Sequence, residues 1–422
     1  MLYNSRTVSF FKRVRQMLPG PSDKMMCMAR RGAAMLLAAV LAAGTLPVPV
    51  LAEQQVTPTP TPDPHGPWYY EPAQTDSLPD WPAGPGIESQ CAVMIDLSNG
   101  GILYSKNADM VMYPASITKI LTCLLAVENL DPAMSFVMTE SAAFGIESGS
   151  SSIYADTDEV FTVEQAIMAL MLESANEMAL MLGELVSGSE KKFVEMMNER
   201  VVKFGCTHTH FNNPNGLPDE NHYTTASDMA KIAFECWKDP RFRHYVTTSY
   251  YDIPPTNKQS ETRYMSNHHK MMEGKDYAYD GVLGGKTGYT EAAGNTLVTY
   301  AQRGDLSLAV VILNSPGTTY GDTAALLDYG FASFSRKDMT GVMRRETPEE
   351  AVTSEFRALA GYRAPFPAAQ RTSGFTITVP EGVSADRIDV IRIPHKNAPG
   401  RPFNEYVYYY EGNRAGSGWE YL

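Results

Sequence analysis

Residues 113–128 read YPASITKILTCLLAVE, and the spacing of their apolar residues predicts an amphipathic helix that begins at Ser116. Pro114 cannot extend a helix backward, which agrees with a start at this point. Ser116 would then lie at a helix N-terminus, where free backbone N–H groups favour developing negative charge. Lys119 follows almost one turn later on the same face. A hydroxyl beside an amine is a nucleophile beside a possible base.

The Ser-x-x-Lys pattern alone is weak, because it also occurs at Ser9–Lys12 and Ser189–Lys192, where no other feature supports it. A second pattern, Ser174-x-Asn176, falls between two predicted apolar helices, the first of which would be capped by Thr162. Polar side chains in such a connector can point into a cleft. The alternative is that Ser174 and Asn176 only cap the neighbouring helix ends.

The third pattern is Lys286-Thr287-Gly288, followed by Tyr289, and Lys-Thr-Gly occurs once in the chain. It leads into segments that predict antiparallel strands. A phosphate-binding loop is the competing interpretation of residues 284–288. A P-loop has an earlier Gly at a fixed spacing and a helix after its Lys-Thr, whereas a strand is predicted here, so phosphate binding is not supported.

Composition restricts the partners of this chain. Its 422 residues carry a net charge of −13, and so acidic a chain is a poor candidate for binding nucleic acid. Cys206-x-His208-x-His210 suggests a metal, but no further ligand cluster accompanies it, and zinc takes four ligands or three plus water. We therefore predict no nucleic-acid partner, no metal and no other cofactor.

The first 52 residues have the features of an export signal. Basic residues precede an apolar run at 32–46, and residues 50–52 offer small side chains for cleavage after Ala52. An uncleaved membrane anchor is the alternative, although Pro47 and Pro49 shorten the run below spanning length. We expect a signal peptide over 1–52 and a protein located outside the cytoplasm, at the cell wall or the outer face of the membrane.

The rest of the chain divides into three parts. Residues 53–85, rich in Pro and Thr, predict an extended linker. Residues 86–338 predict an α+β domain with a hairpin at 91–105, helices to about 190, strands again from 282 and a closing helix from about Thr323 to Phe334. Residues 339–422 predict a connector and a small β-rich domain. Four cysteines follow the signal segment, and their pairing cannot be deduced from the sequence.

Ser-x-x-Lys, Ser-x-Asn and Lys-Thr-Gly, in this order, resemble the penicillin-binding serine D-Ala-D-Ala carboxypeptidases, the low-molecular-mass penicillin-binding proteins, and their β-lactamase relatives. The resemblance runs from about Ile87 to Phe334, and its flanking residues look most like the carboxypeptidases. They are the segments 113–116, 216–217, 222–229 and 285–290. The resemblance implies a β-lactamase/transpeptidase-like fold, an antiparallel sheet flanked by helices with an inserted all-helical region, which matches the predicted order of elements.

The resemblance also implies the chemistry of the first residues. Ser116 would attack the carbonyl between two terminal D-alanines and form an acyl-enzyme. Lys119 would take its proton, and Ser174 would pass a proton to the departing D-alanine. A free lysine has a pKa of about 10.4, but burial and the nearby charge of Lys286 would both lower the pKa of Lys119.

The remaining roles concern the binding of the substrate. Asn176 would orient the peptide and hold the lysine amine. Lys286 and Thr287 would bind the terminal carboxylate, and Gly288 would let the substrate backbone lie close. The oxyanion would rest on the backbone N–H groups of Tyr289 and of the nucleophilic serine.

We therefore expect an exported serine-type D-Ala-D-Ala carboxypeptidase that trims peptidoglycan stem pentapeptides and is acylated and inhibited by β-lactam antibiotics. The alternatives are a β-lactamase and a catalytically weak penicillin- or peptidoglycan-binding protein. A β-lactamase needs a second base, and Glu195, in a helical pattern, is predicted to face solvent. The sequence departs from the family at Glu177, where an Asp is common. It also shows no membrane-binding helix at its C-terminal end.

Overall fold

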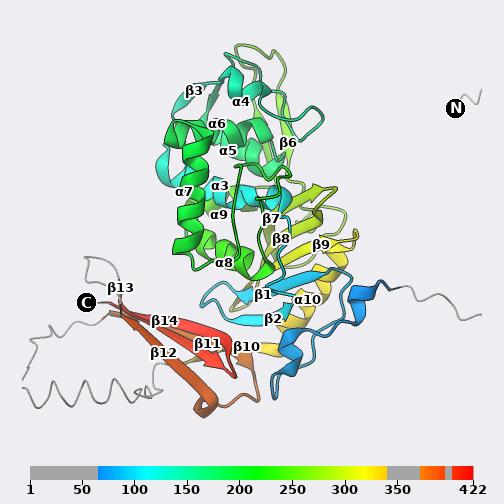
Figure 1. Cartoon of the computed structure of the whole chain (residues 1–422), viewed down its shortest axis with the longest axis vertical. Coiled ribbons are helices and arrows are strands. Elements are labelled where there is room, and N and C mark those ends of the chain that lie inside the picture. The colour runs from blue at the N-terminus through cyan, green and yellow to red at the C-terminus, as the bar shows by residue number, and fades with distance from the viewer. Residues whose placement is uncertain (1–64, 340–370, 395–401, 422) are drawn as a thin grey trace, which may run out of the picture. The chain divides into compact units, whose positions relative to one another are not determined.

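The computed structural model describes residues 65–339, 371–394 and 402–421 (Figure 1). The predicted signal peptide and residues 53–64 of the predicted linker lie outside the described residues. The prediction of an extended linker is wrong for residues 65–85. They contain the 3₁₀ helices η1 (Pro67–Tyr70) and η2 (Gln74–Ser77). They fold against the domain because Trp81 is buried and its Nε1 donates a hydrogen bond to the Leu103 carbonyl, at 3.1 Å.

The core of the large domain is an antiparallel sheet of five strands in the order β2-β1-β9-β8-β7 (Figure 1). The strands are β1 (Cys91–Asp96), β2 (Ile102–Lys106), β7 (Val282–Thr290), β8 (Gly294–Arg303) and β9 (Leu306–Ser315). Strand β1 pairs with β9, with Val93 opposite Val311, so the first hairpin joins strands from the end of the domain. Every residue of β1 is buried, which explains its continuous apolar run.

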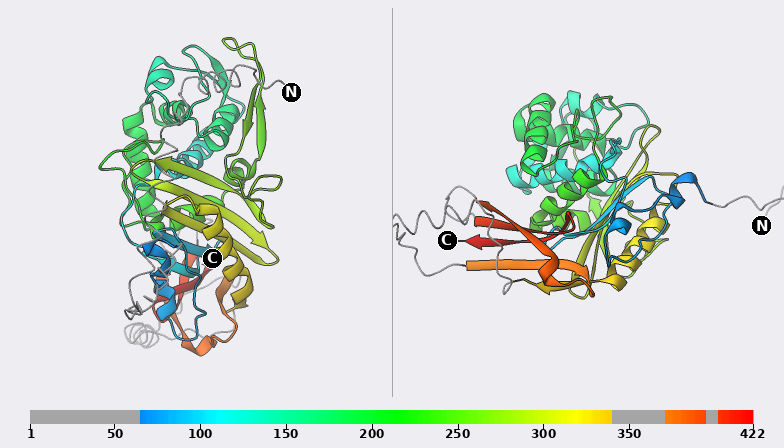
Figure 2. Two further views of the ribbon diagram at one scale, coloured as in Figure 1. Left: turned by 90° about the vertical axis from the view of Figure 1, so that its right-hand side faces the viewer. Right: turned by 60° about the horizontal axis from the view of Figure 1, so that its bottom comes forward.

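The two faces of this sheet belong to two cores. Val93 and Val311 pack into a core shared with the helical region, whereas Met94 and Val310 pack into a core shared with α10 (Thr319–Ser333). Figure 2 shows α10 lying along one face of the sheet. Side chains alternate between faces in a strand, so a central strand must be apolar at every position.

A helical region separates β2 from β7 in sequence, as predicted, and covers the other face of the sheet (Figure 1). It contains η3 (Ala115–Thr118), α3 (Lys119–Asn129), α4 (Glu140–Phe144), α5 (Val163–Leu172), α6 (Asn176–Ser187), α7 (Glu190–Lys203), α8 (Ala226–Trp237) and α9 (Pro240–Thr247). Two small hairpins belong to it, β3 (Ser135–Val137) with β4 (Val160–Thr162), and β5 (Tyr250–Ile253) with β6 (Arg263–Ser266).

The start of the helix predicted at Ser116 needs correction. A 3₁₀ turn over residues 115–118 comes first, and the α-helix begins at Lys119. Ala115 has a φ of +53°, which no α-helix accommodates, so the chain enters the helix through a tight turn. The predicted cap of α5 is confirmed, because Thr162 accepts from the Gln165 amide while the Gln165 side chain accepts from the Thr162 amide.

A second five-stranded antiparallel sheet, ordered β10-β11-β14-β13-β12, forms the C-terminal domain. Its strands are β10 (Phe334–Asp338), β11 (Arg371–Pro380), β12 (Ile388–Pro394), β13 (Pro402–Tyr410) and β14 (Asn413–Tyr421). The predicted boundary at 338/339 therefore lies too late, since β10 already belongs to this sheet. Strand β14 was not predicted, because its glycines hide a strand pattern. The predicted connector, 340–370, lies outside the described residues.

Asp96, at the end of β1, is fully buried and links the two sheets. Its carboxylate accepts hydrogen bonds from the Arg336 guanidinium at 3.1 Å and from the Thr378 hydroxyl at 2.6 Å. The Asn99 amide also donates to Thr378, at 2.9 Å. A buried carboxylate is tolerated only when it is paired and hydrogen-bonded, so these contacts hold the C-terminal sheet at the β1–β2 hairpin.

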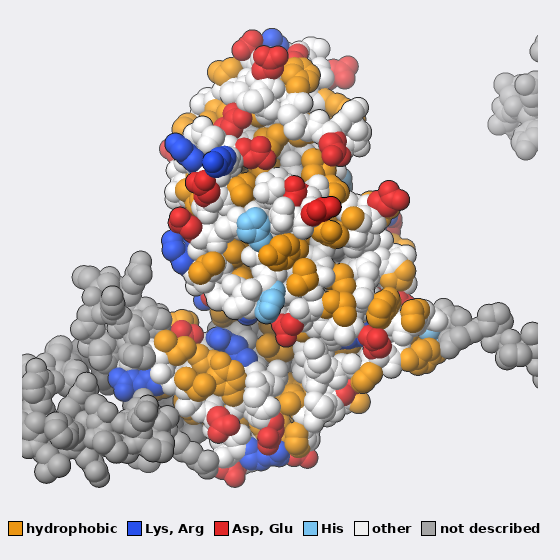
Figure 3. Space-filling view, viewed as in Figure 1, with side chains coloured by type: hydrophobic (Ala, Val, Ile, Leu, Met, Phe, Trp, Pro, Cys, Tyr) orange, Lys and Arg blue, Asp and Glu red, His pale blue; other side chains and the backbone are white. Residues whose placement is uncertain are grey.

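The surface of the C-terminal sheet is partly apolar. Ile391 and Ile393 of β12 are exposed, and the space-filling view shows apolar side chains gathered over this sheet (Figure 3). Within the described residues, no helix is both long enough and apolar enough to cross a bilayer. The last residues described form β14. Cys91, Cys123, Cys206 and Cys236 are buried, free thiols.

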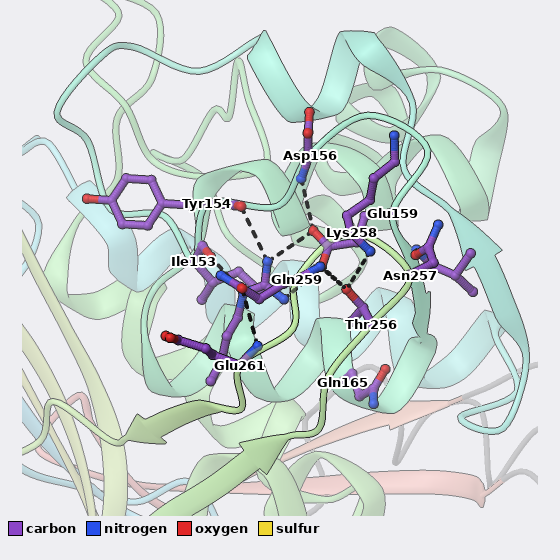
Figure 4. Close-up of polar contacts among 12 residues, drawn as sticks. Ile153, Tyr154, Asp156, Glu159, Gln165, Thr256, Asn257, Lys258, Gln259 and Glu261 are labelled. Atoms are coloured by element: carbon purple, nitrogen blue, oxygen red, sulfur yellow. Dashed lines mark hydrogen bonds and ion pairs between the residues drawn. The ribbon is translucent and has the colours of Figure 1, made fainter.

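A buried ion pair joins the segment before β4 to the β5–β6 hairpin (Figure 4). The Glu159 side chain is fully buried and accepts from the Arg263 guanidinium at 2.8 and 3.0 Å, from the Asp156 amide at 3.0 Å and from the Thr256 hydroxyl. Arg263 also donates to the Ile153 carbonyl at 3.0 Å. Burial alone would raise the pKa of Glu159, but the bonds from Arg263 and Thr256 hold it below its ordinary value.

Replacing Arg263 by Met should therefore destabilise the fold strongly. The substitution keeps the aliphatic stem but leaves the Glu159 carboxylate buried without its cation, which typically costs about 3–5 kcal/mol. Arg241→Met is the control, because its ion pair with Asp239 is exposed and such pairs contribute below about 1 kcal/mol. Urea unfolding at neutral pH measures both losses. Equal losses would contradict a special role for the buried pair.

Candidate active site

Ser116 and Lys119 meet where the 3₁₀ turn passes into α3. The Lys119 Nζ lies 3.0 Å from the Ser116 Oγ, and the lysine side chain is 0% exposed. It lies 2.7 Å from the Asn176 Oδ1 and 2.6 Å from the Asn215 carbonyl oxygen. A neutral amine has two N–H donors and one lone pair. The two oxygens account for both donors, so the lone pair is left facing the serine hydroxyl.

Burial is the main reason why this amine can be unprotonated and so accept a proton. Burial lowers the pKa of Lys119 well below its ordinary value, the Lys286 charge lowers it further, and only Glu177 acts in the opposite direction. The sequence prediction named the same two causes. The structure adds that burial is the larger of the two causes. Lys286 is itself buried, and burial lowers its own pKa to about 7. Lys286 is thus only partly charged at neutral pH.

The loop at 213–217 supplies the carbonyl that sequence reasoning missed. The Gly216 amide donates to the Asn213 Oδ1 at 2.7 Å, and the Thr122 hydroxyl on α3 donates to the Pro214 carbonyl at 2.6 Å. This turn brings the Asn215 carbonyl to Lys119. The signal in the sequence was the turn-forming run Asn-Asn-Pro-Asn-Gly, but nothing in it shows which helix the loop contacts.

Ser174 lies in the connector between α5 and α6, as predicted, whereas Asn176 is already the first residue of α6. Asn176 is buried and bonds Lys119, so it does more than cap a helix. Ser174 has a φ of +61°, a strained conformation for a residue other than glycine. Its Oγ is buried, and no atom of the described residues hydrogen-bonds it. Such an orphan hydroxyl at a pocket wall is suited to bind a substrate or relay a proton.

Strand β7 brings Lys286, Thr287, Gly288 and Tyr289 to the same place. A Cβ on Gly288 would lie 2.9 Å from the Ser116 amide nitrogen, so only glycine lets the strand pass this close to the nucleophile. Lys286 is 1% exposed and donates to the Thr287 carbonyl at 2.9 Å. The structure therefore brings all eight predicted residues around one site.

Six of these eight residues, all except Lys119 and Lys286, line a cavity of about 370 Å³. It is lined by Ser116, Gly149, Ser150, Ser151, Ser174, Asn176, Gly216, Leu217, His268, Thr287, Gly288, Tyr289, Thr290 and Asn295. Sequence reasoning noted the serine cluster at 148–152 but gave it no role, and it missed His268 entirely. Neither belongs to one of the three patterns, and only the tertiary structure brings them to the cavity.

Glu177 fastens the serine cluster to the site. Its Oε1 accepts from the Ser152 hydroxyl and from the Ile153 amide, both at 2.7 Å. The backbone N–H of Asn176 donates to the Ser151 carbonyl at 2.9 Å. The departure from the usual Asp at this position thus has a local consequence, because the longer side chain reaches the cavity-lining loop.

The residues considered as metal ligands have other contacts. The Cys206 thiol contacts the Asp228 carbonyl, the His208 Nδ1 pairs with a neighbouring threonine hydroxyl, and the His210 Nδ1 donates to the Asn221 carbonyl. Across the described residues, no three or more His, Cys, Asp or Glu side chains are grouped as metal ligands would be. The lining of the cavity consists of hydroxyls, amides and backbone, with His268 and Tyr289 as its titratable groups.

The family follows from comparison with known sequences. The model of the D-alanyl-D-alanine carboxypeptidase family, peptidase S11, matches residues 79–317, which is more than half of the chain. The chain belongs to this family of serine peptidases. The resemblance inferred from the three patterns is thereby confirmed.

Two curated relatives show how far the similarity extends. The chain is 31% identical over 251 residues to D-alanyl-D-alanine carboxypeptidase DacF of Bacillus subtilis, a match covering 58% of this chain and 63% of that protein. It is 30% identical over 275 residues to DacB2 of Mycobacterium tuberculosis, covering 62% of this chain and 87% of that protein. The chain thus spans less than two thirds of the length of the Bacillus relative.

Solved structures show the same fold. A D-alanyl-D-alanine carboxypeptidase from Mycobacterium tuberculosis matches with a TM-score of 0.54 and 27% identity, over 62% of this chain and 96% of that one. Penicillin-binding protein 5 from Haemophilus influenzae matches with a TM-score of 0.60 and 25% identity, over 81% of this chain and 98% of that one. The predicted fold class, with its separate C-terminal β domain, is confirmed.

The close packing of the 213–217 loop gives a direct test of the site's architecture. Gly216 has a φ of +87°, and a Cβ there would lie 2.0 Å from the Ala115 carbonyl oxygen. Gly188 has a φ of +84° but open space around it. Both Gly→Ala changes impose left-handed strain of about 1–2 kcal/mol. Gly216→Ala should cost about 1–3 kcal/mol more, because the turn must move.

Urea unfolding of the two glycine variants measures this difference in the free energy of unfolding. Gly188→Ala serves as the control for backbone strain alone. Equal destabilisation by the two substitutions would show that the loop does not press against the turn before the nucleophile.

Proposed function

We propose that this chain is a serine-type D-Ala-D-Ala carboxypeptidase that removes the terminal D-alanine from peptidoglycan stem pentapeptides through an acyl-enzyme on Ser116, and that β-lactams acylate the same serine. The observation that carries the proposal is the 3.0 Å contact between the Ser116 hydroxyl and a fully buried, deprotonation-prone Lys119. The naming of the relatives as D-alanyl-D-alanine carboxypeptidases supports the choice of substrate.

In the first step Ser116 attacks the carbonyl carbon of the scissile peptide while the Lys119 lone pair takes the hydroxyl proton. The oxyanion that forms would accept from the backbone N–H groups of Ser116 and Tyr289, and each such donor is typically worth roughly 3–4 kcal/mol. The C–N bond then breaks, and the departing amine needs one proton. The unpartnered hydroxyl of Ser174 would pass it from Lys119 to the D-alanine nitrogen.

Hydrolysis of the ester would reverse the same proton path. Water adds to the acyl carbon, its proton passes to Lys119, and the Ser116 oxygen leaves and regains a proton. The product is the shortened peptide with a new terminal carboxylate. In the same way a β-lactam would open on Ser116 but keep its leaving amine tethered, so the adduct persists.

The β-lactamase alternative needs a base dedicated to fast hydrolysis of the adduct. The described residues that line the cavity include no carboxylate, and Glu195 is exposed on α7. For the exported location we rely on the predicted signal peptide over residues 1–52. Outside the cytoplasm the proposed substrate, the peptidoglycan stem peptide, would be accessible.

The full-length chain and its Ser116→Ala variant test the proposal directly. Wild-type protein should release D-alanine from a diacylated Lys-D-Ala-D-Ala peptide and form a long-lived penicillin adduct, detected by mass spectrometry. Ser116→Ala should lose at least about 10³-fold in release and form no adduct. Rapid penicillin turnover would favour a β-lactamase. An adduct without D-alanine release would favour a penicillin-binding protein without peptidase activity.

The pH dependence of release should be bell-shaped, because Lys119 must be neutral and Lys286 charged. The rate should fall on the alkaline side as Lys286, with its pKa of about 7, loses its proton. In Lys286→Arg the guanidinium stays charged, so the alkaline limb should move to higher pH even if the maximal rate drops. The limb of kcat/KM, followed from pH 5 to 10, is the readout. An unmoved limb would contradict the role of Lys286.

A further inference from the structure

His222 is a buried histidine that contacts the turn carrying the nucleophile. It belongs to the segment 222–229, which is part of the family resemblance but has no role in the three patterns. The residue is 1% exposed, and its ring packs against the Phe211 ring with the two centroids 5.2 Å apart. It does not line the cavity, and the proposed chemistry does not use it.

The hydrogen bonds of this ring fix its tautomer. The backbone N–H of Asn212 can only donate, and its nitrogen lies 3.1 Å from the His222 Nδ1, so Nδ1 must be an unprotonated acceptor. The single proton of the neutral ring then resides on Nε2, which lies 2.9 Å from the Thr118 Oγ1. His222 therefore donates to the threonine hydroxyl.

The surroundings of the ring favour the same neutral form. Burial lowers the pKa of His222 to about 3, while Asp219 raises it, and His210 and Lys119 lower it. Two of these titratable groups come from the loop that ends at His222, and the third comes from α3. The ordinary pKa is 6.5, so the contribution of the neutral ring to stability is complete above pH 6.5 and is lost as the pH falls from there toward 3. At neutral pH the ring keeps its donor for Thr118.

Thr118 passes this contact on to the peptide bond before the nucleophile. Its hydroxyl has one proton, which it donates to the Ala115 carbonyl oxygen at 2.9 Å. This carbonyl and the backbone N–H of Ser116 belong to one planar peptide unit, so fixing the oxygen also fixes the direction of the N–H. The chain of hydrogen bonds from Asn212 through His222 and Thr118 therefore ends at the N–H group that would stabilise the oxyanion.

This peptide unit needs support because its conformation is strained. Ala115 has a φ of +53°, which is unfavourable for an alanine and persists only where surrounding contacts impose it. Gly216 packs against the same carbonyl oxygen. Because Gly216 lies between Asn212 and His222 in sequence, one histidine ring ties that loop to the strained turn.

We propose that His222 is a positioning residue that, through Thr118, orients the backbone N–H of Ser116 as an oxyanion donor. This role rests on the proposed function, since the oxyanion forms only when Ser116 attacks a carbonyl. Hydrogen bonds in a chain also polarise one another, which strengthens the last donor. The support therefore acts mainly on the transition state, in which the substrate oxygen becomes an anion, and less on the bound substrate.

Two substitutions separate the two hydrogen bonds of the ring. The side-chain amide of glutamine reaches the position of Nε2, and that of asparagine reaches the position of Nδ1. His222→Gln thus keeps a donor for Thr118 and loses the acceptor for Asn212, whereas His222→Asn keeps the acceptor and loses the donor. The full-length chain is assayed with a diacylated Lys-D-Ala-D-Ala peptide. His222→Asn should lower kcat at least about tenfold and change KM less than about twofold, and His222→Gln should retain most of kcat.

A peptide boronic acid measures the oxyanion contact itself, because its tetrahedral adduct on a serine places an oxygen where the oxyanion would lie. In His222→Asn the inhibition constant of this analogue should rise by about the factor by which kcat falls. His244→Asn is the matched control, since His244 is exposed on α9, and it should change neither value.

Variants of Thr118 test whether the effect passes through its hydroxyl. Thr118→Val removes the hydroxyl and keeps the shape, so it should lower kcat about as much as His222→Asn. Thr118→Ser keeps the hydroxyl and should retain most of kcat. The double variant of His222→Asn and Thr118→Val should lose little more than either single variant, because both break the same chain of hydrogen bonds.

The outcomes distinguish positioning, stability and the underlying function. Urea unfolding measures the loss of stability of each variant separately. Unchanged kcat and boronate inhibition in folded His222→Asn, equal losses of kcat in His222→Asn and His222→Gln, or additive losses in the double variant would overturn the role of His222 and leave the carboxypeptidase proposal intact. A wild-type chain that neither releases D-alanine nor forms a penicillin adduct would overturn the proposed function, and the role of His222 with it.

Discussion

The buried amine of Lys119 is the constraint on which the site depends. A charged ammonium without water would cost several kcal/mol, so burial drives the group toward its neutral form. The neutral amine has two N–H groups, which need two hydrogen-bond acceptors, and one lone pair. The oxygens of Asn176 and Asn215 meet the first need, and Ser116 lies where the lone pair points. The same burial that threatens stability thus produces a base.

Meeting this constraint requires three chain segments to approach more closely than most side chains allow. The turn at Ala115 is left-handed, Gly216 packs on its carbonyl, and Gly288 of β7 passes the Ser116 amide. The Thr296 hydroxyl on β8 completes the arrangement by donating to the Pro114 carbonyl at 2.8 Å. Backbone strain of this kind persists only where surrounding structure holds it, and the sheet and helices do so here.

Electrostatics then link the site to its surroundings through carboxylates that are not themselves reactive. Glu177 holds the serine-rich loop, Glu173 contacts His268 and raises the pKa of Lys286, and Glu159 fastens the hairpin that leads to His268. Each is at least partly buried, although the Oε2 of Glu177 has no hydrogen-bond partner among the described residues. The lining of the cavity therefore consists mainly of hydroxyls, amides and backbone, and Lys119 and Lys286 lie outside it.

The sequence alone determined the three reactive patterns, the order of strands and helices, and the family, because these depend on local periodicity and on residue types at short spacings. It also indicated that Lys119 and Lys286 would influence each other. Only the tertiary structure decided that residues 65–85 pack on the domain through Trp81, that β10 and β14 join the C-terminal sheet, and that Asn215 and His268 reach the site. Those outcomes depend on contacts between residues far apart in the chain, and no local pattern encodes which distant surface a loop, a carbonyl or a ring will meet.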